Sequence, residues 1–418
     1  MIRAMVTAAG ILVISGAAAG GAAPGTAAKA ESPVSWEQKN WVQVRSSVDV
    51  EPQGTDEADV SLDVRARVDG RLKLGKSHSS IFLGADIRQE IWNIEDEGEF
   101  TFQLWEAFVE MREPEYAIGV GRQIVTWGKL DDVTIPARVS PQDYRWFILY
   151  DKQERKLPVM MLKGGYYGTR YQVEGAVIPV AEAAKVEYFG TDWSVFDHLK
   201  EALAGGAYPP AAQALVAGMD VRDTDPPDEP EAAVRLRGRR DDTDFSVYYM
   251  SLFDRLPGLR EAGPKGRLVK RFLFQPAAEN LMAVAMAGVT PSDLVLETDY
   301  ERNNVVGFDF ETVAGSYGVR GECAYLSRQP YTREDFSLVR MNTISAGVGV
   351  DHTTDNQIYW NVQWVVDAIL NYEPLFATDE TAHMAVLNVS RDFLDGDLHL
   401  GLESTYRLNY EDWMVHPF

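Results

Sequence analysis

The alternation that decides the fold is VSLDVRARVDGRLKL, which spans residues Val60–Leu74. Every second residue, beginning with Val60, is apolar or glycine, and the residues between them are polar or charged. A β-strand points successive side chains to opposite faces, so this segment has one apolar face and one charged face. Strands usually contain about five or six residues. The longer alternation predicts a strand with lipid on one side and water on the other.

The same period-two pattern recurs along the chain. Short turns alternate with long loops between the patterned segments, as in bacterial outer-membrane barrels. We therefore expect an all-β fold, a transmembrane antiparallel β-barrel of about 14–16 strands, with an inward-folding loop and short helices in its long loops. The predicted strands cover residues 42–50, 60–74, 80–92, 100–111, 116–126, 170–178, 234–239, 244–253, 308–311, 317–327, 338–351, 358–367, 385–389 and 398–408.

The N-terminus has the features of an export signal. Arg3 supplies a positive charge, residues 8–19 are apolar and alanine-rich, and Ala28-Lys29-Ala30 is an A-x-A cleavage site. We expect residues 1–30 to be a signal peptide and residues 31–418 to be the barrel. Export through the Sec pathway would then deliver the chain to the bacterial outer membrane. No later apolar run has the roughly 18 residues of a spanning helix.

Composition argues against several classes of protein. The net charge of −23 disfavours nucleic acid as a partner, because phosphate binding needs clustered lysine and arginine. The single cysteine, Cys323, rules out an internal disulfide. The histidines are scattered without metal-ligand spacing, and no G-x-S-x-G motif is present. We expect no catalytic residue, metal or cofactor, and hence no enzyme; an outer-membrane lipid hydrolase is a less favoured alternative.

Aromatic residues gather near the ends of the predicted strands. Amphipathic rings at the level of the lipid headgroups form the girdles of membrane barrels. The last residue is Phe418, a terminal aromatic of the kind that barrel-assembly machinery typically reads. The expected partners are therefore outer-membrane lipid and lipopolysaccharide, together with the assembly machinery through Phe418.

Two long segments, 180–231 and 254–300, interrupt the alternation. Helical spacing is present at 195–203, in the alanine-rich piece after Pro209-Pro210, and at 276–287. We expect partly helical loops that pack on the mouth of the barrel. A gate or a contact with an apolar ligand is the alternative.

Residues 128–158 form another break in the alternation. A loop of this length is usually functional or disordered, and its aromatic residues argue against disorder. We expect it to fold into or over the lumen. Candidate functional residues in this loop and just before it are Arg122, Gln123, Trp127, Arg138, Asp143 and Arg145.

Physical chemistry suggests roles for the residues before the loop. Arg122, at an inward strand end, can pair with a carboxylate of the following loop, and Gln123 can bond to loop backbone. Trp127-Gly128 lets the chain turn sharply under a ring. The motif either holds the loop in place or contacts a solute directly.

This part of the chain resembles a known family. The run G-R-Q-x-x-x-W-G and the later S-P-x-D are similar to motifs of domain-of-unknown-function family thirteen-oh-two, proteobacterial outer-membrane β-barrels of the porin-like superfamily. Members are often encoded beside RND-type exporters of lipids or hydrophobic compounds, so the resemblance implies a possible periplasmic or inner-membrane exporter as partner. The motif residues are Gly121, Arg122, Gln123, Trp127, Gly128, Pro141 and Asp143.

The alternation also assigns charged residues to the lumen. Rings of charged side chains tune pore selectivity, and the ladder of Arg235, Arg237 and Arg239 is the best local candidate for attracting an anion. We expect a porin-like barrel that passes a small, amphiphilic or hydrophobic solute. The alternative is a non-conducting structural or assembly barrel of an envelope complex. Further predicted lumen-facing charges are Asp63, Arg65, Arg67, Asp309 and Glu311.

Overall fold

The structure is a computed structural model that describes residues 6–10, 34–48, 60–74, 79–91, 99–131, 133–145, 154–189, 194–196, 199, 209–396 and 398–417. Its main sheet has 17 strands, and a second sheet has 3. Without the short β1 (Val6–Gly10), the main sheet has sixteen strands, and neighbouring strands pair antiparallel. The predicted class, a transmembrane antiparallel β-barrel of about 14–16 strands, is confirmed. The predicted signal peptide stays a prediction.

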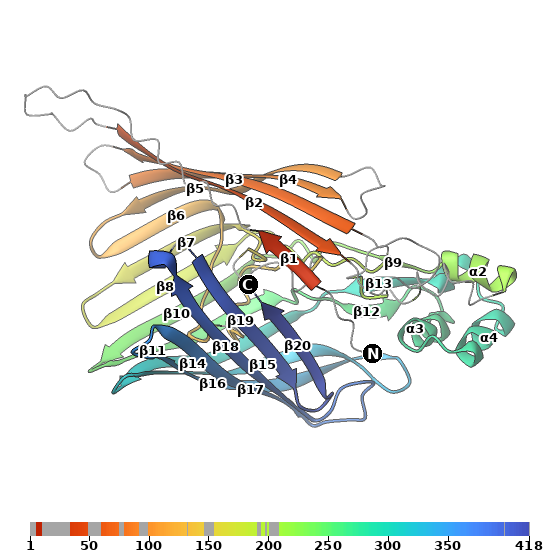
Figure 1. Ribbon diagram of the computed structural model, residues 1–418. Coiled ribbons are helices and arrows are strands. Elements are labelled where there is room, and N and C mark those ends of the chain that lie inside the picture. Colours follow the sequence, from red (N-terminus) through yellow and green to blue (C-terminus); the bar gives the residue numbers. More distant parts are fainter. Residues whose placement is uncertain are drawn as a thin grey trace, which may run out of the picture. The chain divides into compact units, whose positions relative to one another are not determined.

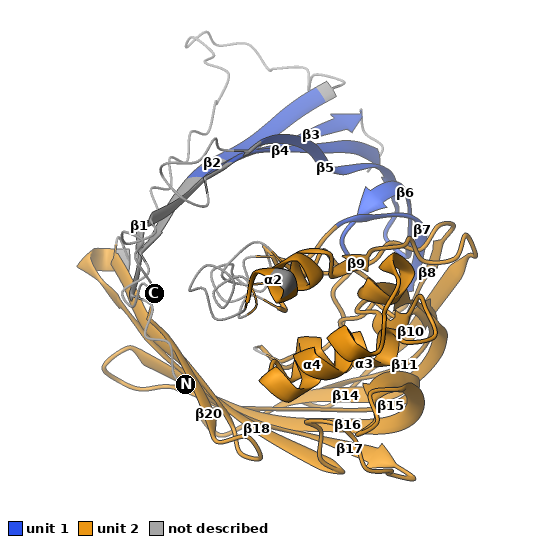
Figure 2. Cartoon of the chain, turned by 90° about the vertical axis from the view of Figure 1, so that its right-hand side faces the viewer, with its two compact units in different colours: residues 1–124, 158–167 blue, residues 125–157, 168–418 orange. Residues whose placement is uncertain are grey.

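The chain divides into two compact units, which Figure 2 colours separately. Unit 1 comprises residues 1–124 and 158–167, and unit 2 comprises residues 125–157 and 168–418. Besides β1, the strands of unit 1 are β2 (Val34–Val48), β3 (Val60–Leu74), β4 (Ser79–Ile91), β5 (Glu99–Arg112), β6 (Tyr116–Gln123) and β7 (Val159–Tyr167). The main-sheet strands of unit 2 are β8 (Tyr171–Ile178), β10 (Glu231–Arg240), β11 (Thr243–Phe253), β14 (Arg302–Ala314), β15 (Tyr317–Thr332), β16 (Leu338–Thr353), β17 (Ile358–Leu370), β18 (Thr381–Phe393), β19 (Leu398–Arg407) and β20 (Asp412–Pro417).

Most predicted strands are present, but β7 and the last strand, β20, were not predicted. Val159 and Met161 are buried on one face of β7, whereas Met160 and Leu162 are exposed on the other. Because both faces are apolar here, the sequence lacks the polar alternation that marks the other strands. Strand β6 also ends at Gln123, before the predicted boundary at 126.

The sheet buries polar side chains and exposes apolar ones. On β17, Asn361 and Gln363 are buried, while Val362 and Trp364 are 45% and 43% exposed. Because residues of alternate parity lie on opposite faces, the inner face is polar and the outer face is apolar. A soluble protein buries apolar side chains and exposes polar ones. The opposite arrangement here is the pattern of a strand between lipid and an aqueous lumen.

The lengths of the connections within unit 2 distinguish one end of the strands from the other. Residues 241–242 and 315–316 are short turns, whereas residues 179–230 and 254–301 are long segments at the opposite strand ends. Outer-membrane barrels place short turns in the periplasm and long loops outside. We therefore place the two long segments at the external end.

The two long segments fold together into one small insert. Figure 1 shows its helices side by side at one end of the unit 2 strands. Helices α2 and α4 confirm the predicted short helices, whereas α3 and the three strands were not predicted. No helix among the described residues is long and apolar enough to cross a membrane. The elements are α2 (Pro210–Ala217), α3 (Gly266–Phe274), α4 (Ala278–Met286), η2 (Pro291–Leu294), β9 (Asp220–Arg222), β12 (Gly258–Glu261) and β13 (Val295–Asp299). Most of the predicted 195–203 helix lies outside the described residues.

The insert has its own apolar core. Three phenylalanines join it to the connections of the barrel strands: the ring of Phe274 in α3 lies 5.7 Å from that of Phe376, which lies 4.9 Å from that of Phe336. These tilted and edge-on contacts fix where the insert sits on unit 2. The core residues are Phe196, Leu199, Val216, Met219, Val221, Leu259, Val269, Phe272, Leu273, Leu281, Val284 and Leu296.

One cation lies inside this core, and we expect it to make the stability of the insert depend on pH. Lys270 is fully buried, and its Nζ donates to the carbonyl oxygen of Leu259 at 2.5 Å. Burial lowers the pKa of Lys270 to about 8, from an ordinary value of 10.5. Between these two pH values the unfolded insert binds more protons than the folded one, so stability should rise with pH. The gain should reach at most about 3 kcal/mol.

The measurement is hydrogen exchange of the α3 amides at pH 7.5 to 10, corrected for intrinsic exchange rates. Lys270→Met keeps the length of the side chain and removes the charge, so its protection should vary less across this range. Equal pH dependence in the wild type and the variant would contradict the assignment.

Candidate functional site

The inner face of unit 2 holds the described part of the loop formed by residues 125–157, and the Glu322 carboxylate is one of its anchors. Glu322 on β15 accepts backbone N–H groups of Lys129 and of Leu130 (2.8 Å) through Oε1, and that of Ile135 (2.7 Å) through Oε2. The side chain is buried, so these bonds are shielded from water. A charged acceptor with three N–H donors is a strong, oriented anchor.

A second polar cluster holds the same turn of the loop. Asp131 accepts hydrogen bonds from Arg320, from Asn361 Nδ2 (2.6 Å) and from Tyr359 OH (3.2 Å). The donors come from β15 and β17, so the loop is joined to side chains on separate strands of the inner face. The backbone N–H of Val133 donates to Gln363 Oε1 at 3.3 Å.

Two glycine positions allow the loop to approach the sheet closely. Gly128 has φ +119°, and a Cβ there would lie 1.9 Å from Thr134 Cγ2 and 2.6 Å from Glu322 Oε1. The Leu130 side chain lies over Gly347 on β16, where a Cβ would be 2.7 Å from Leu130 Cδ1. The predicted sharp turn at Trp127-Gly128 therefore has a steric cause.

The predicted lumen acids Asp309 and Glu311 lie beside this anchor. Glu311 accepts the Nζ of Lys129 at 2.7 Å and the Nε of Arg320 at 3.2 Å. Asp309 is fully buried and stands directly opposite Glu322 on one neighbouring strand and Ser246 on the other. The inner face therefore gathers three carboxylates around one loop.

Arg255, which the sequence analysis did not select, holds the middle of the loop. Its guanidinium donates to the carbonyl oxygens of Arg138 (3.1 Å), Val139 (2.8 Å) and Glu182 (3.0 Å), and to Glu231 Oε2 at 2.9 Å. An arginine can serve several acceptors at once because its donors form a rigid fork. No alternation or motif surrounds Arg255, so the sequence offers no signal for this role.

The predicted arginine ladder lies on β10, but its three members differ. Arg235 forms an ion pair with Glu174 and stacks over the buried ring of Trp127, at 5.2 Å from its centroid. Two predicted residues more than a hundred positions apart thus make a cation–π contact. Arg237 is half-buried without a hydrogen bond or ion pair among the described residues, and the Arg239 side chain is 70% exposed.

The remaining predicted loop residues form separate contacts. Arg138 Nη1 donates to Gln329 Oε1 at 3.3 Å, and burial lowers the pKa of Arg138 against the opposing effect of Asp367. Asp143 is buried and accepts two hydrogen bonds from the guanidinium of Arg145, at 3.0 and 2.9 Å. This bidentate pair stiffens the loop locally.

Unit 1 presents its own charged inner face. Arg65 is fully buried, pairs with Asp86 at 2.6 Å and lies over Trp105. Arg67 pairs with Asp69 at 3.0 Å. The side chain of Asp63, another predicted lumen residue, lies outside the described residues.

The G-R-Q motif lies at the end of β6 in unit 1. Gly121 has φ +135°, and a Cβ there would lie 2.2 Å from the carbonyl oxygen of Ala107. Arg122 is half-buried, and Gln123 is buried with its amide 3.5 Å from the carbonyl oxygen of Gly121. The predicted pairing of Arg122 with a loop carboxylate stays a prediction.

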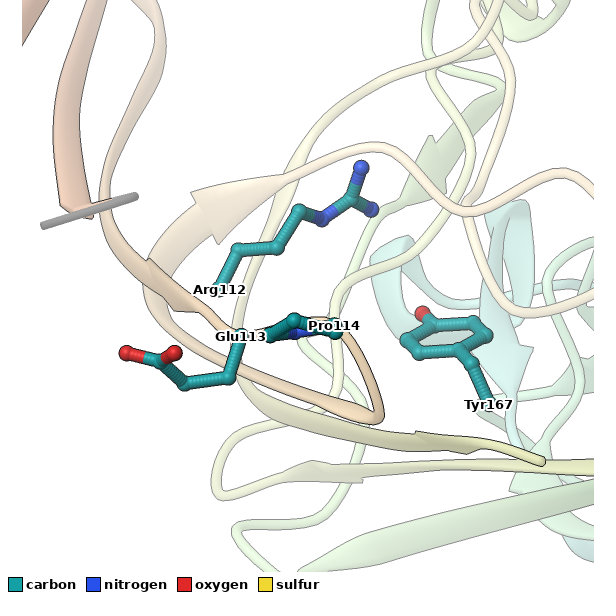
Figure 3. Close-up of a pocket in the computed structure, with 4 residues that line it drawn as sticks. All are labelled: Arg112, Glu113, Pro114 and Tyr167. Carbon is teal, nitrogen blue, oxygen red and sulfur yellow. The ribbon is translucent and has the colours of Figure 1, made fainter.

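A small cavity of about 360 Å³ lies in unit 1 at the short turn between β5 and β6. Figure 3 shows Arg112 and Tyr167 on two sides of it and the Glu113 carboxylate pointing away. The Arg112 guanidinium carbon is 5.9 Å from the Tyr167 ring centroid. The sequence analysis did not select this turn, because it is short and lies between two alternating strands.

A sheet with an apolar outer face, a polar inner face and a loop lying on that inner face defines an outer-membrane barrel of the porin-like class. The chain belongs to the family described as "Protein of unknown function (DUF1302)", whose model matches residues 93–393. The predicted family is confirmed. No curated protein matches the chain.

Solved structures of outer-membrane channels are similar to this chain. The channel DcaP of Acinetobacter baumannii has a TM-score of 0.44 at 9% identity, over 93% of this chain and 96% of its own. Salmonella typhi OmpF, solved in complex with daunomycin, has a TM-score of 0.46 at 9% identity, over 92% and 97%. Pseudomonas aeruginosa OpdK, solved with vanillate, has a TM-score of 0.40 at 9% identity, over 92% and 95%.

Replacing Glu322 tests the anchor. Glu322→Gln removes the charge and one of the two acceptor oxygens, so we expect the loop to open more easily by about 2 kcal/mol. That difference corresponds to about thirtyfold faster exchange of the Leu130 and Ile135 amides with deuterium.

Glu311→Gln is the matched control, since Glu311 bonds the Lys129 side chain and not the loop backbone. It should leave these two amides protected. Unchanged exchange in Glu322→Gln would show that the carboxylate does not hold the loop.

Proposed function

We propose that this barrel lets a small solute diffuse across the outer membrane through its lumen, with residues 125–157 narrowing the path. The proposal rests mainly on the polar inner face and on the loop bound to it through Glu322 and Asp131. A loop on the inner face sets the size and charge of what can pass. We infer that the barrel has no enzymatic activity and uses no energy of its own.

The lining favours an amphiphilic solute. Met341, Ile369 and Leu375 form a buried apolar cluster, and the partly buried Tyr331, Val339 and Tyr372 pack against it. Arg138 lies close enough to Tyr331 for electrostatic interaction. An apolar surface next to a cation suits a solute with an apolar body and an anionic or polar head. The resemblance to barrels encoded beside RND-type exporters is compatible with such a solute and with a periplasmic or inner-membrane exporter as partner.

A second candidate function is a non-conducting barrel that serves a structural or assembly role in an envelope complex. The density of contacts on the loop favours it, because Glu322 binds three of its backbone amides and Arg255 binds two of its carbonyl oxygens. A loop held this firmly can close the lumen permanently. A measurement of conductance distinguishes the two candidate functions.

Planar bilayers provide the test of passage. Replacing residues 128–157 with a short glycine-serine linker should raise the single-channel conductance severalfold, because it removes the obstruction from the inner face. Glu322→Gln should give intermediate or flickering conductance. If wild type and linker variant were both silent while correctly folded, the structural function would replace the channel.

Charge selectivity tests the arginine ladder. Arg237→Glu should shift the ratio of anion to cation permeability towards cations by about twofold or more, since Arg237 forms no ion pair in direct contact with a carboxylate among the described residues. Arg240→Glu is the matched control, because the Arg240 side chain is 88% exposed at the strand end. Equal reversal potentials for the two variants would show that Arg237 does not lie on the permeation path.

A further inference from the structure

The outer face of β2 carries two amide side chains. Lys39 pairs with Asp69 on β3, and Trp41 pairs with Arg67. The side chains of Asp69 and Arg67 form an ion pair on the charged inner face. Gln38 and Asn40 have the opposite parity, so they lie on the outer face. Gln38 is exposed and Asn40 is half-exposed.

Apolar residues surround this amide pair on the sheet. Gln38 stands opposite Gly70, and Asn40 opposite Val68, which is 40% exposed. The next strand adds Leu83 and Ala85 in the same rows. Two amides therefore lie within a surface that otherwise suits hydrocarbon.

The amides are ordered but not fully bonded. Trp36 Nε1 donates to Gln38 Oε1 at 3.2 Å, and Gln38 Nε2 donates to Asn40 Oδ1 at 2.9 Å. No acceptor for the Asn40 amide group is present among the described residues. Lipid tails cannot accept a hydrogen bond, so a free amide on this face is costly.

The Trp36 ring and the small residue Ala66 lie next to the amides on the same face. The Trp36 ring covers Gly70, where a Cβ would lie 2.1 Å from Trp36 Cη2. Ala66 lies one step further along the same face of β3. A small residue such as Ala66 on a membrane-embedded face lets a second backbone approach closely.

From these observations we infer that the outer face of β2 and β3 around Gln38 and Asn40 binds a second copy of this chain across a two-fold axis. A primary amide is both donor and acceptor, so the same pair of side chains can bond to its own copy. A two-fold contact is isologous, and each Asn40 can then donate to the amide oxygens of the partner's identical pair. A charged partner would not match this neutral, self-complementary surface.

The test measures the mass of the detergent-solubilised full-length protein by light scattering. Wild type should be a dimer, and Gln38→Leu with Asn40→Val should weaken dimerisation at least about tenfold. The double variant makes the face more apolar, so it is expected to fold; heat-dependent migration on a gel checks this. A folded double variant that stays fully dimeric, or a wild type that is monomeric at all concentrations, would overturn the proposal.

Disulfide trapping in the native outer membrane gives an independent readout. In a Cys323→Ser background, Asn40→Cys should form a cross-linked dimer on mild oxidation. Val306→Cys is the matched control, since Val306 is 48% exposed on the outer face of β14 and should not cross-link. Equal trapping at both positions would indicate random collision in the membrane and would contradict the proposal. Cross-linking of Asn40→Cys to a different protein would show that this protein, and not a second copy of the chain, occupies the surface.

Discussion

The lack of hydrogen-bonding groups in lipid is the constraint on which the fold depends. A backbone N–H or C=O without a partner is too costly there, so a membrane-crossing chain of strands pairs each strand with its neighbours. The antiparallel register from β10 through β20 meets this demand, and side-chain parity then follows automatically. One face takes the apolar residues, such as Val362, and the other takes Asn361 and Gln363. The inner face is polar because the apolar residues of each strand occupy the face that meets lipid.

A polar inner face gives the loop formed by residues 125–157 its binding surface. Glu322 and Asp131 both join the loop to the sheet. Glu322 lies on the sheet and binds loop backbone, whereas Asp131 lies on the loop and binds side chains of the sheet. Arg255 adds a third attachment from the insert side. The loop is therefore fixed at several points by charge-assisted hydrogen bonds, and these are stronger where water is excluded. Passage and closure both depend on the same contacts.

The strands were largely predictable from sequence, and the site only partly. The alternation at 60–74 gave β3 at its observed bounds, whereas β7 was missed because Met160 and Met161 give both of its faces an apolar character. Trp127 and Arg235 were both selected, but their stacking depends on a fold that joins a loop to a distant strand. Arg255 has no local signal at all, since its role comes from carbonyl oxygens of other segments.

By itself, the sequence determined the fold class, the direction in which most strand residues point and the position of the long breaks, because period two is a local property of the chain. The family motif added the expected kind of barrel. Only the tertiary structure decided which carboxylate holds the loop, which arginine of the ladder forms an ion pair with Glu174, and that two separate segments form one insert with a common core. Those outcomes depend on pairings between residues far apart in the chain, and the local pattern of a strand carries no information about its distant neighbours.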